Sequence, residues 1–214
     1  MAKAAKTVGD YEIKHHETAR YFENPILERL SRTPGWSPLV AWLPIIALVV
    51  YGAVVDTAVS AGQMVLLAVG GVLFWTLTEY WLHRKFFHWT RPERLHFIIH
   101  GAHHMYPNDY GRVVFPPTAS LALGAVFYLI FLAVLGYGMT LPFFGGFVVG
   151  YLWYDMTHFW VHVGKPRSRY GRFVRRHHML HHFSQPEHKF GVSTPLWDFV
   201  FGTYGKAAGK GDPA

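Results

Sequence analysis

Histidine forms the clearest chemical pattern in this sequence. Ten of the fifteen histidines fall into four short clusters. The clusters are His83 with His88; His100, His103 and His104; His158 with His162; and His178, His181 and His182. Residues three or four apart share one face of a helix, so each of the last three clusters would project its imidazoles in one direction. Because neutral imidazole binds transition metals, the pattern predicts a metal site built from several histidines.

The pair His83 and His88 has a different spacing. Residues five apart lie roughly 140° from each other round a regular helix, so a regular helix cannot turn both rings toward one metal. We therefore expect irregular backbone at this pair, near the end of a helix.

The number of histidines limits the kind of site. A mononuclear zinc site needs three or four protein ligands, whereas ten imidazoles supply five to each of two metals. Six-coordinate metals would then keep about one position each for dioxygen, water or substrate. Two zinc ions favour hydrolysis, whereas two iron ions permit reductive activation of dioxygen. The chain has no cysteine, which excludes thiolate ligands. We expect no catalytic residue beyond the ten metal ligands.

Three further polar residues lie about one helical turn before a clustered histidine. They are Glu79, before His83; Asp155, before His158; and His96, before His100. A carboxylate at this spacing can accept a hydrogen bond from the free ring N–H of a ligand and orient the ring. We expect Glu79, Asp155 and His96 to lie just outside the ligands and to help orient them. For the two acidic residues, an equally compatible interpretation is that the side chains reach the membrane interface.

The composition predicts a membrane protein. The chain is 51% hydrophobic and only 15% charged, less charge than a soluble domain of this size carries. Four apolar runs, at residues 39–55, 64–82, 119–135 and 143–161, are each long enough to cross a hydrocarbon core. We predict an all-α integral membrane protein with four transmembrane helices in two hairpins and a histidine-rich helical cap that holds a dimetal site.

The positions of lysine and arginine predict the topology. Residues 1–38 hold six, 56–62 none, 83–118 five, 136–142 none and 163–214 nine. Cytoplasmic flanks of spanning helices retain these residues, so both termini and the metal site are expected on the cytoplasmic side of a multi-pass protein. The net charge of +7 resides beside the spans, not in a soluble basic domain. Anionic lipid headgroups, and not nucleic acid, are therefore the expected counter-charge.

The remaining segments are short. We expect residues 1–38 to form a cytoplasmic N-terminal segment that approaches the membrane, mobile over 1–19. Residues 39–204 would form the catalytic domain, with short cytoplasmic helices over 94–105 and 170–183. Residues 205–214 would be a disordered tail. A metal site at the membrane face suits a lipid, whose reactive end lies near the headgroups and whose long tail lies among the spans.

The sequence resembles the fatty acid hydroxylase branch of the sterol desaturase and fatty acid hydroxylase superfamily, particularly the fatty acid 2-hydroxylases. The resemblance covers roughly residues 21–204. Besides the histidine clusters, it rests on Glu79-Tyr80 with His83-Arg84, Leu95-His96-Phe97 before His100-Gly101, Arg112 with Phe115-Pro116-Pro117, Gly150-Tyr151 with Tyr154-Asp155, and Phe190-Gly191 before Trp197-Asp198.

The resemblance implies a dioxygen-dependent enzyme with two iron ions on the ten histidines, although a purified sample could contain zinc. The substrate would be a long-chain fatty acyl lipid or a ceramide, hydroxylated at C2 beside the acyl carbonyl. Eukaryotic 2-hydroxylases carry a fused cytochrome b5 domain ahead of the spans, where this sequence has only residues 1–38. Electrons are therefore expected from a separate redox protein of the ferredoxin or cytochrome b5 type.

Other functions fit the histidine pattern. A desaturase or a sterol or carotenoid hydroxylase of the same superfamily would share the clusters. A two-zinc membrane hydrolase would need carboxylate ligands and a general base, for which only Glu79 and Asp155 are candidates. A metal transporter would place its ligands along a path through the bilayer, whereas these clusters gather at one face.

Overall fold

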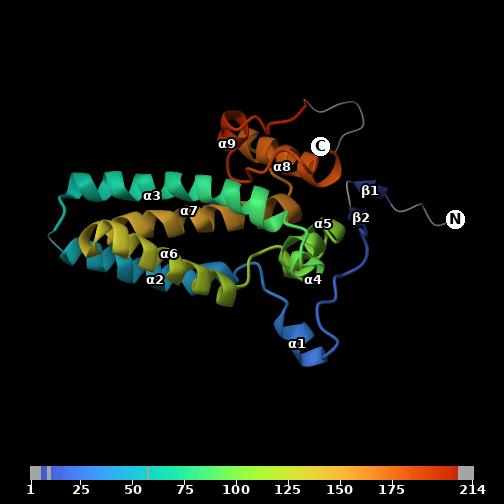
Figure 1. The fold of residues 1–214 in the computed structure, drawn as a ribbon, viewed down its shortest axis with the longest axis horizontal. Helices are drawn as coiled ribbons and strands as arrows, with labels where there is room; N and C mark the ends of the chain where they lie inside the picture. Colours follow the sequence, from blue (N-terminus) through green and yellow to red (C-terminus); the bar gives the residue numbers. More distant parts are fainter. Residues whose placement is uncertain (1–5, 9–10, 57, 207–214) are drawn as a thin grey trace.

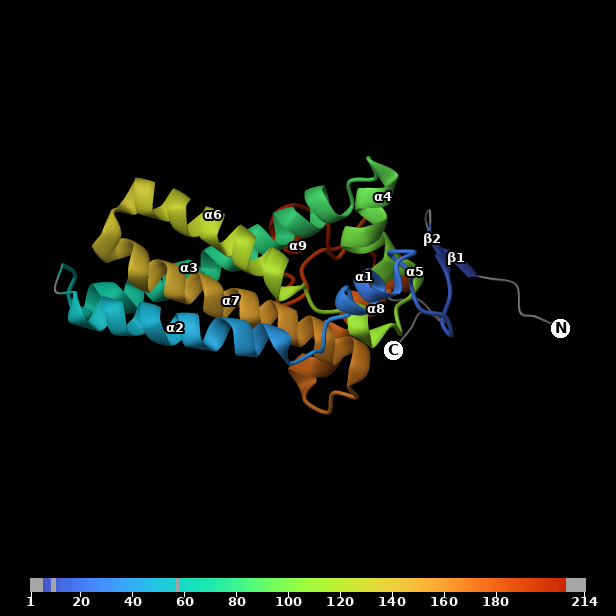
Figure 2. The same ribbon diagram turned by 90° about the horizontal axis from the view of Figure 1, so that it is seen from below.

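The fold is a bundle of long helices with a smaller assembly of short helices and loops at one end (Figure 1). The computed structural model describes residues 6–8, 11–56 and 58–206. The long helices, which lie side by side in both ribbon views (Figures 1 and 2), are α2 (Ser37–Val55), α3 (Ala61–Trp81), α6 (Pro117–Leu135) and α7 (Tyr137–Val163). Each contains most or all of one predicted apolar run, so the sequence located these helices correctly.

Among the described residues, three stretches are long and apolar enough to cross a membrane. They are Ser37–Val55, Ala61–Phe87 and Tyr110–Leu135. Helix α7 is not among them, because glycines and the polar residues Asp155, His158 and His162 interrupt its apolar sequence. The prediction of four spans is thus supported for three helices by length and composition.

Helix α7 is the most enclosed of the long helices and packs against α2, α3 and α6. Glycines let α3 and α7 approach until their backbones touch. A Cβ on Gly146 would lie 1.9 Å from the carbonyl oxygen of Ala68, and one on Gly71 would lie 2.0 Å from that of Phe143. Small residues permit such close packing in helical bundles. The contact fixes the end of α7, and with it His158 and His162, beside the end of α3.

The assembly at the end of the bundle is called the cap and comprises residues 11–36, 82–116 and 164–206. Its helices are α1 (Pro25–Leu30), α4 (Glu93–His96), α5 (Ala102–Met105), α8 (Arg169–Phe183) and α9 (Leu196–Val200). Two π-helices, η1 (Leu82–Phe87) and η2 (Phe97–Gly101), and the 3-10 turn η3 (Tyr110–Arg112) complete it. The predicted helix over 94–105 is thus a continuous helical run from Glu93 to Met105 with a π-helical centre. The predicted helix over 170–183 corresponds to α8.

The N-terminal segment adds a feature that the all-α prediction lacked. Strands β1 (Lys6–Val8) and β2 (Tyr11–Ile13) form an antiparallel ribbon in which Val8 is paired with Tyr11. Tyr11 and Ile13 are buried, as their alternation along a strand allows. The backbone N–H of Lys14 donates to the carbonyl of Met105 at 2.7 Å. Residues 11–19, for which the sequence predicted mobility, therefore contact the rest of the cap. Residues 1–5, 9–10 and most of the predicted disordered tail, 207–214, lie outside the described residues.

Candidate metal centre

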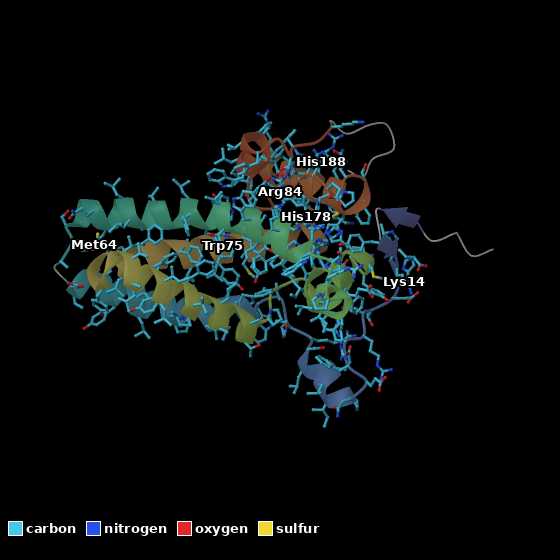
Figure 3. All side chains as sticks on the ribbon, viewed as in Figure 1. Lys14, Met64, Trp75, Arg84, His178 and His188 are labelled. Carbon is cyan, nitrogen blue, oxygen red and sulfur yellow. The ribbon has the colours of Figure 1, made fainter. Side chains whose placement is uncertain are left out.

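The four histidine clusters meet where the cap joins the bundle, at the position of His178 in Figure 3. They form two groups of five, and within each group one ring nitrogen of every member lies within 4.8 Å of the others. The first group is His83, His88, His100, His104 and His181; the second is His103, His158, His162, His178 and His182. All but the half-buried His88 are buried. The fold thus brings together the ten histidines that the sequence singled out.

Each histidine triplet contributes to both groups. His100 and His104 lie one helical turn apart and face the first group, whereas His103 faces the second. The prediction that each triplet turns all its rings in one direction is therefore wrong, because consecutive residues on a helix point about 100° apart and His103 and His104 cannot face one centre. The other triplet mirrors this division, with His178 and His182 in the second group and His181 in the first.

The pair His83 and His88 lies in irregular backbone, as its spacing required. The π-helix η1 widens the last turn of α3, and the N–H of His88 donates to the carbonyl of His83 at 3.4 Å. A π-helical turn contains one residue more than an α-helical turn, so residues five apart come to lie on one face. The two ring centroids are 5.2 Å apart.

The ring nitrogens within the groups are spaced as ligands of a six-coordinate metal would be. Six pairs of Nε2 atoms lie 2.9 to 3.1 Å apart. With a metal–nitrogen distance of about 2.1 Å, ligands at right angles are about 3.0 Å apart, and tetrahedral ligands about 3.4 Å. The donor set therefore fits a near-octahedral cation better than tetrahedral zinc.

Backbone carbonyls fix the orientation of three of the rings. Nδ1 of His83 lies 2.6 Å from the carbonyl oxygen of Phe190, Nδ1 of His181 2.7 Å from that of His188, and Nδ1 of His162 3.1 Å from that of Pro107. A carbonyl can only accept, so each Nδ1 carries the proton and donates. The Nε2 lone pair of each ring is then free to bind a cation.

Burial favours the neutral form of six of the clustered histidines. It is the largest cause that lowers the pKa of six imidazoles, and neighbouring histidines lower it further; the six are His100, His103, His104, His178, His181 and His182. Desolvation disfavours the charged imidazolium, and like charges would repel one another. These rings can therefore accept a cation at neutral pH without first releasing protons.

Glu79 does not bond to His83, contrary to the sequence-based expectation. Its carboxylate accepts hydrogen bonds from the N–H groups of Val192 and Ser193, at 2.7 and 2.9 Å, and from the Ser193 hydroxyl at 2.5 Å. The carbonyl of Phe190, and not the carboxylate of Glu79, accepts the hydrogen bond from Nδ1 of His83. Glu79 acts on the loop that contains Phe190, a contact between residues more than a hundred positions apart that helical spacing cannot reveal.

Asp155 likewise bonds to other partners than His158. Its carboxylate accepts from the N–H of Phe115 at 3.1 Å and from the hydroxyl of Tyr151 at 3.0 Å. Both partners belong to the segments that surround the cavity described below. Asp155 therefore ties α7 to the start of α6.

His96 bonds to no member of either group but supports the first one from outside. Its Nδ1 donates to the carbonyl of Phe87 at 3.0 Å, beside His88, and its Nε2 accepts from the hydroxyl of Tyr11 at 3.0 Å. The Tyr11 ring stacks on His104 with centroids 4.6 Å apart. Tyr11 was missed from the sequence, where only its place in a short alternating stretch hinted at burial.

A cavity of about 450 Å³ opens beside both groups. His100 of the first group and His103 and His158 of the second line it, together with apolar walls that include Phe87, Ile98 and Phe115. Phe87, Phe115 and Tyr154 also line a narrower cavity of about 30 Å³ among the long helices, near Trp75 in Figure 3. The two cavities therefore adjoin at these three side chains, between the histidines and the bundle.

The cavity wall also contains a neutralised cation. The guanidinium of Arg112 lies 3.8 Å over the ring of Tyr21, pairs with Glu28, and lies 3.4 Å from the carboxylate of Asp109. Two carboxylates surround this one positive charge, so the wall presents no unpaired cation at this position.

The sequence is similar to that of several known hydroxylases. The family model described as "Fatty acid hydroxylase" matches residues 68–203. The dihydroceramide fatty acyl 2-hydroxylase FAH1 of Arabidopsis thaliana is 35% identical and is aligned over 91% of this chain and 86% of its own length. The fatty acid 2-hydroxylase of Rattus norvegicus is 34% identical, over 86% of this chain and 56% of its own length.

Yeast proteins are similar in sequence and structure. The ceramide very long chain fatty acid hydroxylase SCS7 of Saccharomyces cerevisiae is 38% identical, over 83% of this chain and 47% of its own length. The chain thus spans about half the length of the rat and yeast relatives. A solved structure described as full-length scs7p, with only the hydroxylase domain visible, has a TM-score of 0.82 and 36% identity, and covers 89% of this chain and 74% of that chain.

Proposed function

Because this chain belongs to the fatty acid hydroxylase family, whose members are oxidoreductases, we propose that it inserts a hydroxyl group at C2 of a long fatty acyl chain. The proposal rests on the position of the cavity, because apolar side chains and histidines of both groups line it together. The relatives named as dihydroceramide and ceramide hydroxylases support a sphingolipid substrate. Arg112 supports a substrate with no negative charge at its end, because the guanidinium is already paired with Glu28 and Asp109.

The ten histidines are proposed as ligands of two iron ions, five to each. Two irons bound there supply the reductive activation of dioxygen, which with two electrons and two protons converts C–H and O2 to C–OH and water. The chain itself orients the ligands through the carbonyls of Pro107, His188 and Phe190. A hydrolase is disfavoured by the same geometry, because Glu79 and Asp155 are bonded to the backbone and do not enter either group.

The protein also holds the acyl chain and excludes water. Phe87, Ile98 and Phe115 give the cavity an apolar wall, against which the methylene groups beyond C2 would pack. Tyr154 borders both cavities, and its ring stacks on His158 with centroids 5.8 Å apart. The far end of the acyl chain would lie among the long helices, and the carbonyl end near Tyr21.

We propose that α7 crosses the membrane with α2, α3 and α6, giving four spans in two hairpins. Helices α2 and α3 are adjacent at the end of the bundle away from the cap, as are α6 and α7 (Figure 1). In the part of the chain that the structure describes, the lysines and arginines lie on segments at the opposite end. The cap, the metal centre and both termini would then face the cytoplasm.

Electrons are proposed to come from a separate redox protein. Helix α8 supports this, because its buried face provides three candidate ligands while Arg172 and Arg176 are exposed on the other side. A basic surface attracts an acidic partner and speeds the encounter.

Lipid mass spectrometry tests the proposed function. Cells with and without the gene should differ in acyl lipids heavier by one oxygen atom, and fragmentation should place the hydroxyl at C2. A double bond in place of the hydroxyl would identify a desaturase, and no difference in any lipid would refute the proposal.

A further inference from the structure

The loop of residues 188–193 provides backbone carbonyls to the first histidine group. Nδ1 of His181 donates to the carbonyl of His188 at 2.7 Å, and Nδ1 of His83 donates to that of Phe190 at 2.6 Å. Among the described residues of the second group, the corresponding bond joins His162 to Pro107, on a different segment. The loop thus orients two members of one group only.

Lys189, between these carbonyls, has an unusual backbone conformation. Its φ is 64°, in the left-handed region that a residue with a side chain adopts rarely and only when its surroundings hold it there. Its N–H donates to the carbonyl of Thr203 at 2.8 Å, and its Nζ donates to that of Tyr204 at 2.5 Å. This conformation places the carbonyls on either side of Lys189 against two rings of the same group.

Two buried carboxylates hold the rest of the loop. Asp198 is fully buried and accepts four hydrogen bonds, from the N–H groups of Phe190 and Gly191 (both 2.9 Å), from the Thr203 hydroxyl (2.8 Å) and from Nε2 of His177 (3.0 Å). Glu79 accepts from Val192 and Ser193 as described above. Together they satisfy four consecutive backbone N–H groups, from residue 190 to residue 193.

We propose that Asp198 and Glu79 are positioning residues for metal binding by the first histidine group. They fix the loop 188–193, whose carbonyls lock His83 and His181 with Nε2 toward the metal. The inference rests on the proposed function only in taking the two groups to be metal sites. It predicts that damage to the loop removes one metal and leaves the other, because no bond of the loop reaches the second group among the described residues.

The hydrogen bonds predict opposite results for two conservative substitutions. In D198N, either orientation of the amide turns an NH2 group toward a backbone N–H, of Phe190 or of Gly191, so one bond to the loop is lost. In E79Q the amide oxygen can accept from both backbone N–H groups while the NH2 donates to the Ser193 hydroxyl, which can reverse its role. A role of negative charge alone would make both variants equally harmful.

Lys189 offers a test that leaves the buried carboxylates untouched. K189G and K189V both lose the bond from Nζ to Tyr204. Glycine adopts a φ of 64° without strain, whereas β-branched valine does not. K189G is therefore the matched control for K189V.

The experiment titrates Co²⁺ into the metal-depleted, detergent-purified full chain and measures bound cobalt and its visible spectrum. The parent, E79Q and K189G should bind two ions per chain, whereas D198N, E79A and K189V should keep one and bind the other about 10- to 100-fold more weakly. The affected site is identified in two backgrounds, H178A/H182A and H100A/H104A. D198N should weaken binding of the remaining ion by the same factor in the first background and leave its affinity unchanged in the second.

Two results would overturn the inference. One is two ions bound to D198N and K189V with parental affinity. The other is an equal loss of affinity in both backgrounds, which would indicate general unfolding. Neither result depends on lipid oxidation, so a chain that binds metal as predicted but hydroxylates nothing would refute the proposed function and leave this inference standing.

Discussion

The imidazole rings of His104 and His182 lie stacked, with centroids 4.2 Å apart and planes inclined by 20°, although they belong to different histidine groups. His103 contacts both sides of this boundary, since its ring lies 5.5 Å from that of His100 and 4.5 Å from that of His182. The two groups are therefore halves of one site, and loss of a ligand from either half should stop the reaction.

Alanine substitutions of single histidines test this relationship. Each of H103A, H104A, H181A and H182A should reduce hydroxylated lipid below detection and lower bound metal by about one ion per chain. Membrane insertion should be unchanged, because the long helices do not contain these residues. Full turnover by any one variant would show that the residue is not an essential ligand. H16A, in an exposed part of the N-terminal segment, serves as the control.

The metal-depleted chain should lose stability in acid. Burial lowers the pKa of the histidines of the two triplets below their usual 6.5, so on acidification the unfolded chain takes up protons first. The free energy of unfolding should be constant with pH above about 6.5 and fall below it, by up to about 1.4 kcal/mol per pH unit for each such histidine. Thermal unfolding in detergent between pH 8 and 5 measures this. A melting temperature that stays constant as the pH is lowered from 6.5 to 5 would contradict the prediction.

The Tyr11 ring should slow the escape of metal from the first group. It covers His104 by stacking and bonds to His96 through its hydroxyl. Y11A should release metal to a chelator faster than the parent, because water gains access to His104. Y11F keeps the stacked ring and should release metal almost as slowly as the parent. Equal release rates for Y11A and the parent would show that the strand β2 does not protect the site.

A larger side chain at Ile98 should obstruct the cavity. I98W adds volume to the wall beside His100 and is expected to raise the KM for the lipid several-fold while two metal ions stay bound. L95W on the preceding turn is the matched control, because Leu95 is 52% exposed and does not line the cavity. An unchanged KM in I98W would place the acyl chain elsewhere.

Charge reversal on α8 should slow electron delivery. R172E/R176E is expected to lower turnover with an acidic donor at low salt by about tenfold, and the difference should vanish at high salt. Arg175, which the sequence places in the same basic run, is unsuitable, because it is half-buried and donates to the carbonyls of Val161 and Gly164. Turnover insensitive to both salt and reversal would exclude this surface as the docking site.

The sequence predicted the long helices and the convergence of the histidines because both depend on local periodicity. The spacing of His83 and His88 even predicted irregular backbone, which η1 provides. The division of each triplet between two groups was not predicted, because we expected the three rings of a triplet to share one helix face.

The supports of the histidines could not be predicted in the same way. Helical spacing suggested Glu79 and Asp155 as partners of the ring three or four residues away, but backbone N–H groups brought in by tertiary packing compete with that ring for the carboxylate. In the structure those N–H groups, of Val192 and of Phe115, are the partners. Every residue has a backbone carbonyl, so the sequence cannot show that the carbonyl of Phe190 is the one that bonds to His83.

The order of the chain has a consequence for biosynthesis. All ten imidazoles have been synthesised by residue 182, but the carbonyls that fix two of them follow at His188 and Phe190, and the carboxylate that holds those carbonyls follows at Asp198. A nascent polypeptide therefore carries every ligand before it can stop two of them from rotating. Metal capture in the final arrangement therefore has to follow the synthesis of Asp198 and the packing of the loop 188–193 against α3.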